Sequence, residues 1–140
     1  MPVTFLTGGC HCGAVRYRVM GAVQGLFHCH CSICRRIHGA LFASAALIAA
    51  DRFVVEAGAD RLTRYESSPG NARYFCAVCG AAIYSSSEQV PAIRFFTVGT
   101  LDGGAHPGHS RDRQCHIFVG SKVPWWQIGD DLPQFAELPS

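Results

Sequence analysis

Seven of the eight cysteines lie in three short clusters, and this pattern constrains the chain more than any other feature. The clusters are Cys10-His11-Cys12, Cys29-His30-Cys31-Ser32-Ile33-Cys34 and Cys76-Ala77-Val78-Cys79. Cysteines at such spacings are typical of metal sites in chains that are not exported. Four thiolates complete a tetrahedral zinc site, whereas three leave one position open to water or substrate. Seven ligands therefore predict one closed site and one open site.

The length of 140 residues suits one domain, and we expect residues 1–140 to form a single zinc-binding domain. The N-terminus, Met1–Leu6, has neither a basic segment nor a long apolar run, so no signal peptide is expected. No stretch approaches the roughly 20 apolar residues of a membrane span. We therefore expect a cytoplasmic protein with reduced thiols and no membrane partner. The formal charge of +2 is too small to indicate a nucleic-acid partner, and metal-bound thiolates would make it negative.

The periodicity is mostly that of β-strands. Val15, Tyr17 and Val19 alternate with arginines, as in a half-buried strand. Helix is expected only at 32–38, where Gly39 provides a C-terminal stop, and 126–135 is expected to be irregular. Many short strands separated by turns predict an all-β domain, either a sandwich or open sheets. Further strands are expected at 26–28, 41–48, 53–56, 62–66, 72–76, 82–85, 92–98 and 113–119.

Two cysteine pairs fit the closed site. If Cys10 and Cys12 lie on a strand, their side chains share one face and can reach one metal. Cys76 and Cys79, followed by Gly80, have the spacing of a zinc knuckle. A metal that joins the two pairs would staple the N-terminal strand to the middle of the chain, so that its binding energy becomes folding energy.

The middle cluster contains three thiols within six residues, so it cannot connect distant segments and suits an open, catalytic zinc. The alternative is a second structural zinc with a fourth ligand from elsewhere. The candidates for that ligand are His28, His30, His38, Cys115 and His116. Three of them have simpler interpretations: His30 should point away from its cysteine neighbours, Cys115 should be a buried free thiol, and His116 should be a hydrogen-bonded strand histidine.

Several segments together resemble the glutathione-dependent formaldehyde-activating enzyme family, which shares its domain with centromere protein V. The resemblance covers most of the chain and implies an all-β fold of the Mss4-like or β-tent kind. It also implies two zinc ions. Cys10, Cys12, Cys76 and Cys79 match the structural site, and Cys29, Cys31 and Cys34 match the catalytic and more labile one. The segments that carry the resemblance are Gly8–Val15, Cys29–Arg35, Phe75–Gly80, His116–Val119 and Ser121–Trp125.

The resemblance further implies a carbon–sulfur lyase that adds the thiol of glutathione reversibly to formaldehyde, giving S-hydroxymethylglutathione. Arg35, Arg36 and Lys122 are candidates to bind the glutathione carboxylates, and Trp125 is a candidate apolar wall. The Arg35-Arg36 pair fits the solvated face of a short helix equally well. The loop at 99–112 is the best candidate for substrate selection.

Two other functions remain open. One is a lyase that uses the same zinc with a different thiol or carbonyl compound. The other is a non-catalytic zinc-binding module for a protein or nucleic-acid partner, which basic stripes with interleaved aromatic residues would indicate. The arginines here are scattered and there is no basic tail, so the enzyme is favoured.

Overall fold

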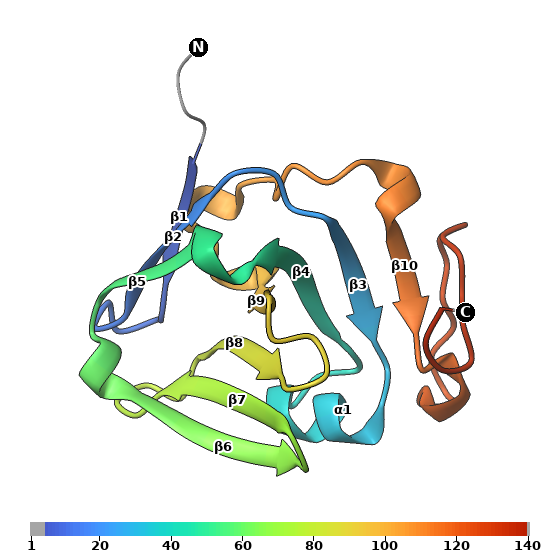
Figure 1. Cartoon of the computed structure of the whole chain (residues 1–140). Coiled ribbons are helices and arrows are strands. Elements are labelled where there is room, and N and C mark those ends of the chain that lie inside the picture. Colours follow the sequence, from blue (N-terminus) through green and yellow to red (C-terminus); the bar gives the residue numbers. More distant parts are fainter. Residues whose placement is uncertain (1–4, 140) are drawn as a thin grey trace.

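The computed structural model describes residues 5–139, which contain ten strands, one α-helix and several single 3₁₀ turns. The strands form a three-stranded sheet in the order β1-β2-β5 and a seven-stranded sheet in the order β10-β3-β4-β9-β8-β7-β6 (Figure 1). The all-β prediction is confirmed. The strands are β1 (Phe5–Gly9), β2 (Arg16–Met20), β3 (Gly25–Cys29), β4 (Ala43–Ala49), β5 (Phe53–Ala57), β6 (Leu62–Ser68), β7 (Asn71–Cys76), β8 (Ala82–Ser87), β9 (Ile93–Thr97) and β10 (Gln114–Ile117), and the helix is α1 (Ser32–His38).

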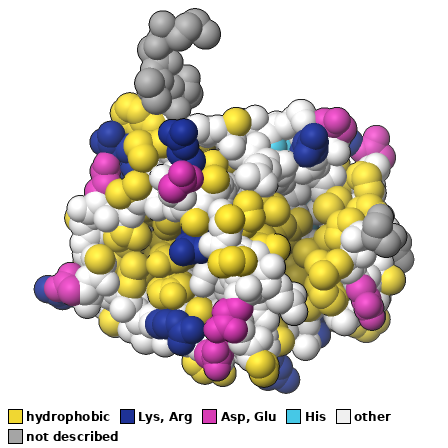
Figure 2. All heavy atoms as spheres, viewed as in Figure 1, with side chains coloured by type: hydrophobic (Ala, Val, Ile, Leu, Met, Phe, Trp, Pro, Cys, Tyr) yellow, Lys and Arg dark blue, Asp and Glu magenta, His cyan; other side chains and the backbone are white. Residues whose placement is uncertain are grey.

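The main hydrophobic core lies where the two sheets meet. The rings of Tyr17 on β2 and Phe53 on β5 pack at a tilt of 31° with centroids 5.0 Å apart, and both contact Phe96 on β9 of the larger sheet. Apolar side chains gather over this region in Figure 2, with charged side chains around it. The alternation that predicted β2 therefore buries one face of that strand against the second sheet.

A smaller core surrounds the end of β3. Cys29, Cys34, Ala43 and Ile117 are buried together, so α1 packs against β3, β4 and β10. The strands of the large sheet are antiparallel except that β10 runs parallel to β3. This parallel pairing brings the C-terminal part of the chain beside the middle cysteine cluster.

The helix was predicted correctly. It begins after Cys31 and ends at Gly39, whose φ of 57° is the left-handed conformation that glycine tolerates. The irregular segment 126–135 is also confirmed, apart from an isolated bridge between Gln134 and His116. No helix in residues 5–139 is long and apolar enough to cross a membrane.

Two expectations at the N-terminus were wrong or incomplete. The strand β1 was not foreseen, because its sequence, Phe-Leu-Thr-Gly-Gly, has no alternation of apolar and polar residues. The placement of Cys10 and Cys12 on a strand was wrong. Strand β1 ends at Gly9, and Cys12 lies in a tight turn between β1 and β2.

Candidate metal centres

The cysteines at positions 10, 12, 76 and 79 form one group, the four-cysteine cluster, with all four sulfur atoms within 4.8 Å of one another. The Cys12 sulfur lies 3.6 Å from that of Cys10 and 3.8 Å from that of Cys76. Zinc–sulfur bonds of about 2.3 Å place the sulfur atoms of a tetrahedral site about 3.8 Å apart. The spacing of these thiols therefore fits a tetrahedral metal ion.

Two tight turns bring these sulfur atoms together. After β7, Gly80 donates its N–H to the Cys76 carbonyl at 2.7 Å, and its φ of +80° allows the chain to reverse. After β1, Gly13 closes a turn onto the Cys10 carbonyl at 3.2 Å, and Val15 donates its N–H to Cys10 Sγ, also at 3.2 Å. The four-cysteine cluster thus connects the three-stranded sheet to the seven-stranded sheet.

The cysteines at positions 29, 31 and 34 form the three-cysteine cluster, whose sulfur atoms also lie within 4.8 Å of one another. Cys29 ends β3, Cys31 caps the N-terminus of α1, and Cys34 lies in its first turn. The Cys34 N–H donates to Cys31 Sγ at 3.2 Å. The Cys31 sulfur therefore caps α1, and the same position at the start of the helix makes it available as a metal ligand.

The three-cysteine cluster gains no fourth ligand from residues 5–139. Among the described residues, no histidine, carboxylate or other cysteine places a ligand atom within the group. The residues considered above for a second structural zinc all lie outside it: His28, His30, His38, Cys115 and His116. Within residues 5–139 the group therefore consists of three thiols, which is the donor set of an open site.

Each cluster contains a thiol that ionises readily. Hydrogen bonds from the Cys29 and Cys34 thiols lower the pKa of Cys31 to about 2. Backbone N–H groups of Cys12 and Ala81 lower the pKa of Cys79 to about 6. A metal binds the thiolate form, so both clusters offer a first ligand at neutral pH. Both clusters could hold a metal ion, and all-thiolate donor sets suit zinc.

Arg73 is a neighbour of the three-cysteine cluster that the sequence did not reveal. It lies on β7, and its guanidinium nitrogens Nη1 and Nη2 are 3.5 and 3.6 Å from Cys34 Sγ. Its Nε donates to Ser67 Oγ on β6 at 3.0 Å. Position 73 is 39 residues from Cys34 along the chain, and only the pairing of the sheet brings the two together.

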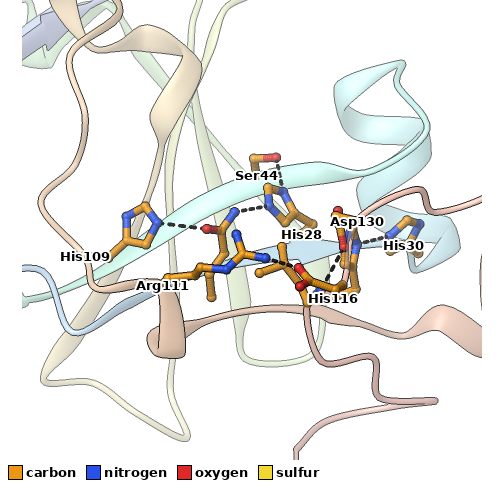
Figure 3. Close-up of polar contacts among 10 residues, drawn as sticks. His28, His30, Ser44, His109, Arg111, His116 and Asp130 are labelled. Carbon is orange, nitrogen blue, oxygen red and sulfur yellow. Dashed lines mark hydrogen bonds and ion pairs between the residues drawn. The ribbon is translucent and has the colours of Figure 1, made fainter.

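A chain of histidines lies along β3 and β10 (Figure 3). His30 Nε2 is 2.8 Å from His116 Nδ1, and His116 Nε2 is 2.9 Å from the Asp130 carboxylate. His30 and His116 are almost completely buried. The predictions that His30 points away from the cysteines and that His116 is a hydrogen-bonded strand histidine are confirmed. In this chain His116 donates from Nε2 to the Asp130 carboxylate, and a hydrogen bond joins His116 Nδ1 to His30 Nε2.

A second polar chain runs beside the first. The side-chain amide of Gln114 donates to His28 Nε2 at 2.8 Å, so His28 donates from Nδ1 to Ser44 Oγ at 2.7 Å. The pKa values of His28 and His30 are both lowered to about 4, first because burial disfavours the imidazolium and then because of the charge of His116. These histidines are therefore neutral and connect β3 to β4 and β10.

The predicted substrate-binding residues occupy two places. Arg35 and Arg36 border an open hollow of about 430 Å³ together with Leu41 and Val123. Lys122 is not directed into this hollow, because its ammonium donates to the carbonyls of Val123 at 3.0 Å and Trp126 at 2.5 Å. The neighbouring Trp125 is 73% exposed.

Two other predictions concern residues outside the clusters. Cys115 is a free thiol, half-buried rather than buried, and burial raises its pKa. The loop at 99–112 is attached to β2 through the ion pair between Asp102 and Arg16, whose Nη1 lies 3.0 Å from the carboxylate. Within residues 5–139, no hydrogen bond joins this loop to the three-cysteine cluster.

Comparisons with known proteins show what this chain is similar to. The family of glutathione-dependent formaldehyde-activating enzymes matches residues 5–121. A protein of Halomonas elongata, provisionally named a glutathione-dependent formaldehyde-activating enzyme, is 32% identical over 131 residues, which are 88% of this chain and 80% of that protein. A crystal structure of a Rhodobacter sphaeroides protein is similar with a TM-score of 0.62 and 32% identity, covering 72% of this chain and 91% of the other. The chain described here belongs to the glutathione-dependent formaldehyde-activating enzyme family.

Proposed function

We propose that the protein is a zinc-dependent carbon–sulfur lyase that catalyses the reversible addition of a small thiol, most simply glutathione, to formaldehyde or a related aldehyde. The observation that carries the proposal is the contrast between a group of four thiols and a group of three thiols to which the described residues add no fourth ligand. Membership of the family and the name of the Halomonas relative support the choice of substrates.

Cys29, Cys31 and Cys34 would hold the catalytic zinc, and the other four clustered cysteines would hold the structural one. A zinc ion with three thiolate ligands can take a fourth thiol as thiolate, which stays nucleophilic because the thiolates offset the charge of the metal. In the forward reaction the substrate sulfur bonds to the carbonyl carbon. The π electrons move to oxygen, which takes up a proton from solvent in place of the one that the thiol released, and the product is a hemithioacetal.

The rest of the substrate would lie against α1 and the segment that follows β10. Arg35 Nε has no protein partner among the described residues, so this guanidinium can donate hydrogen bonds to a carboxylate. Lys122 would act indirectly, since its contacts with the carbonyls of Val123 and Trp126 hold the loop that presents Trp125. Exposed Trp125 offers an apolar surface beside the charged groups.

The test is to follow metal coordination while thiol is added. We expect the cobalt-substituted protein to gain a sulfur-to-cobalt charge-transfer band on titration with glutathione, and X-ray absorption of the zinc form to change from three to four sulfur ligands at one of two metal ions. S-methylglutathione, which has the same carboxylates but no thiol, should produce neither change. An unaltered coordination shell with glutathione would contradict the open-site proposal.

Catalysis needs a separate measurement, because thiols and formaldehyde also combine without an enzyme. Exchange between free glutathione and its hydroxymethyl adduct can be measured at equilibrium by nuclear magnetic resonance. We expect zinc-loaded protein to accelerate this exchange, Cys34→Ser to abolish the acceleration, and Cys115→Ser, which removes a thiol outside both clusters, to retain it. Equal exchange with and without wild-type protein would exclude this lyase activity.

A further inference from the structure

The thiols of the three-cysteine cluster receive hydrogen bonds from different sources. Cys31 Sγ accepts from a backbone N–H of α1, so its partner belongs to the same short segment. Cys34 Sγ instead accepts from the Arg73 guanidinium, which reaches it from β7 in the larger sheet. The hydrogen-bond donor to Cys34 is therefore a side chain, which a substitution can remove, and it reaches the sulfur only in the folded protein.

The position of Arg73 is well defined. Its Nε donates to Ser67 Oγ, so β6 and β7 hold the guanidinium while its two terminal nitrogens face the sulfur. A planar guanidinium with parallel donors suits such two-point contact, whereas a lysine ammonium is a single point charge. The contact also joins the β6–β7 hairpin to α1.

Three thiolates and a divalent zinc ion carry a net charge of about −1, and a bound substrate thiolate increases this to about −2. A guanidinium at hydrogen-bond distance from one thiolate offsets part of that charge. Its hydrogen bonds also occupy lone-pair directions of the sulfur and orient it, as partners of metal-bound ligands do. The Cys34 sulfur then becomes a poorer nucleophile and keeps its place as a ligand.

This matters because the proposed co-substrate is an electrophile. A carbonyl compound that reacts with a metal-bound substrate thiolate can equally react with a metal-bound protein thiolate, which would form a carbon–sulfur bond on the protein and cost the metal a ligand. We propose that Arg73 is a positioning residue that holds Cys34 as a metal ligand and protects its sulfur from the electrophile, so that the aldehyde reacts with the substrate thiolate. This inference rests on the proposed function for the identity of the electrophile.

The first test measures metal affinity without any substrate. Competition with a chromophoric chelator should show that Arg73→Gln binds one of its two zinc ions about 10- to 100-fold more weakly than wild type, which is the usual effect of removing a partner of a metal ligand. Arg73→Lys keeps the charge but loses the two-point contact, and we expect an intermediate loss. The second zinc ion, in the four-cysteine cluster, should be unaffected and should report that the variants are folded.

The second test measures the reactivity of the sulfur. The zinc-loaded protein is treated with iodoacetamide, in which the thiolate displaces iodide, and the alkylated peptides are followed by mass spectrometry. Alkylation at Cys34 should be about tenfold faster in Arg73→Gln, whereas Cys115 should react at the wild-type rate. Arg64→Gln is the matched control. Arg64 lies in the same hairpin, with its side chain 53% exposed beside Glu66, and its removal should change neither measurement.

The outcomes separate this inference from the function on which it rests. Unchanged zinc affinity and unchanged Cys34 alkylation in Arg73→Gln would overturn the role of Arg73 even if glutathione binds the metal. The expected changes together with no glutathione coordination would support Arg73 and overturn the proposed lyase. A wild-type protein that binds only one zinc ion would overturn both.

Discussion

At the scale of single residues, the two clusters differ in what each cysteine connects. Cys76 belongs to a group that joins turns far apart in the sequence, whereas Cys34 belongs to a group contained in one short segment. We expect Cys76→Ser to lose more than about 4 kcal/mol of unfolding free energy, the large effect associated with loss of a structural metal. Cys34→Ser should lose one zinc ion and about 1 kcal/mol. Urea unfolding and metal counting on the same samples measure both.

Cys115→Ser is the control for this comparison, since Cys115 is half-buried and lies outside both clusters. It should retain two metal ions and nearly wild-type stability. If Cys34→Ser unfolded the protein as Cys76→Ser does, the three-cysteine cluster would be a second structural site.

Tyr17 provides a prediction for alkaline pH. It is completely buried, its hydroxyl is hydrogen-bonded to Thr100 Oγ1 at 2.7 Å, and burial raises its pKa to about 12. The unfolded chain releases this proton near pH 10, but the folded chain keeps it. Tyr17 therefore causes no pH dependence of the free energy of unfolding below pH 10, and it lowers that energy as pH rises from 10 to about 12.

Tyr17→Phe isolates this contribution. At neutral pH the variant should be less stable by about 1 kcal/mol, because the hydrogen bond is lost. Between pH 10 and 12 its stability should fall less steeply than that of wild type, so the two curves should converge. Urea unfolding across this range measures the difference, and parallel curves would show that Tyr17 does not titrate with folding.

At the scale of the elements, Gly8 explains part of the motif before the first cysteines. A Cβ atom at Gly8 would lie 2.4 Å from the ring of Tyr17 and 2.6 Å from the Thr100 carbonyl, so the Tyr17 ring fits beside β1 only without a side chain there. We expect Gly8→Ala to lower the free energy of unfolding by about 2–3 kcal/mol through overpacking. Gly99→Ala, where a Cβ meets nothing within 4 Å and the backbone does not require glycine, should change stability by less than about 0.5 kcal/mol.

Equal thermal unfolding of the two variants would contradict the close approach of β1 and β2. Glycine is required in this chain for two different structural reasons. At Gly8 the missing side chain makes room for the Tyr17 ring and the Thr100 carbonyl, whereas at Gly80 the positive φ allows the knuckle turn.

The elements that were predictable from the sequence were those with local signals. The helix followed from its length and from Gly39, and both cysteine groups followed from ligand spacing. The unpredicted features are long-range. The strand β1 depends on space left by glycine, the parallel pairing of β10 with β3 spans most of the chain, and Arg73 meets Cys34 only after the sheet forms. Such contacts depend on register, which a single sequence does not encode in its local pattern.

At the scale of the whole molecule, the four-cysteine cluster connects the two sheets whose contact forms the main core. We propose that residues 1–140 form one domain and that this metal stabilises it as a cross-link between sheets. The three-cysteine cluster lies beyond that junction, at the end of β3, where the smaller core and the histidine chain support it independently. The fold should therefore tolerate the loss of one metal and not of the other.

Stepwise removal of metal tests this division. As chelator is added, we expect the first zinc to leave while far-ultraviolet circular dichroism stays native and thiol exchange activity disappears. Removal of the second zinc should unfold the domain cooperatively, because binding energy at that site is folding energy. The order has a physical cause: the open site has three protein ligands and admits solvent, whereas the closed site has four. Arg73→Gln should advance the first step and leave the second in place, whereas unfolding at the first step would show that both metals are structural.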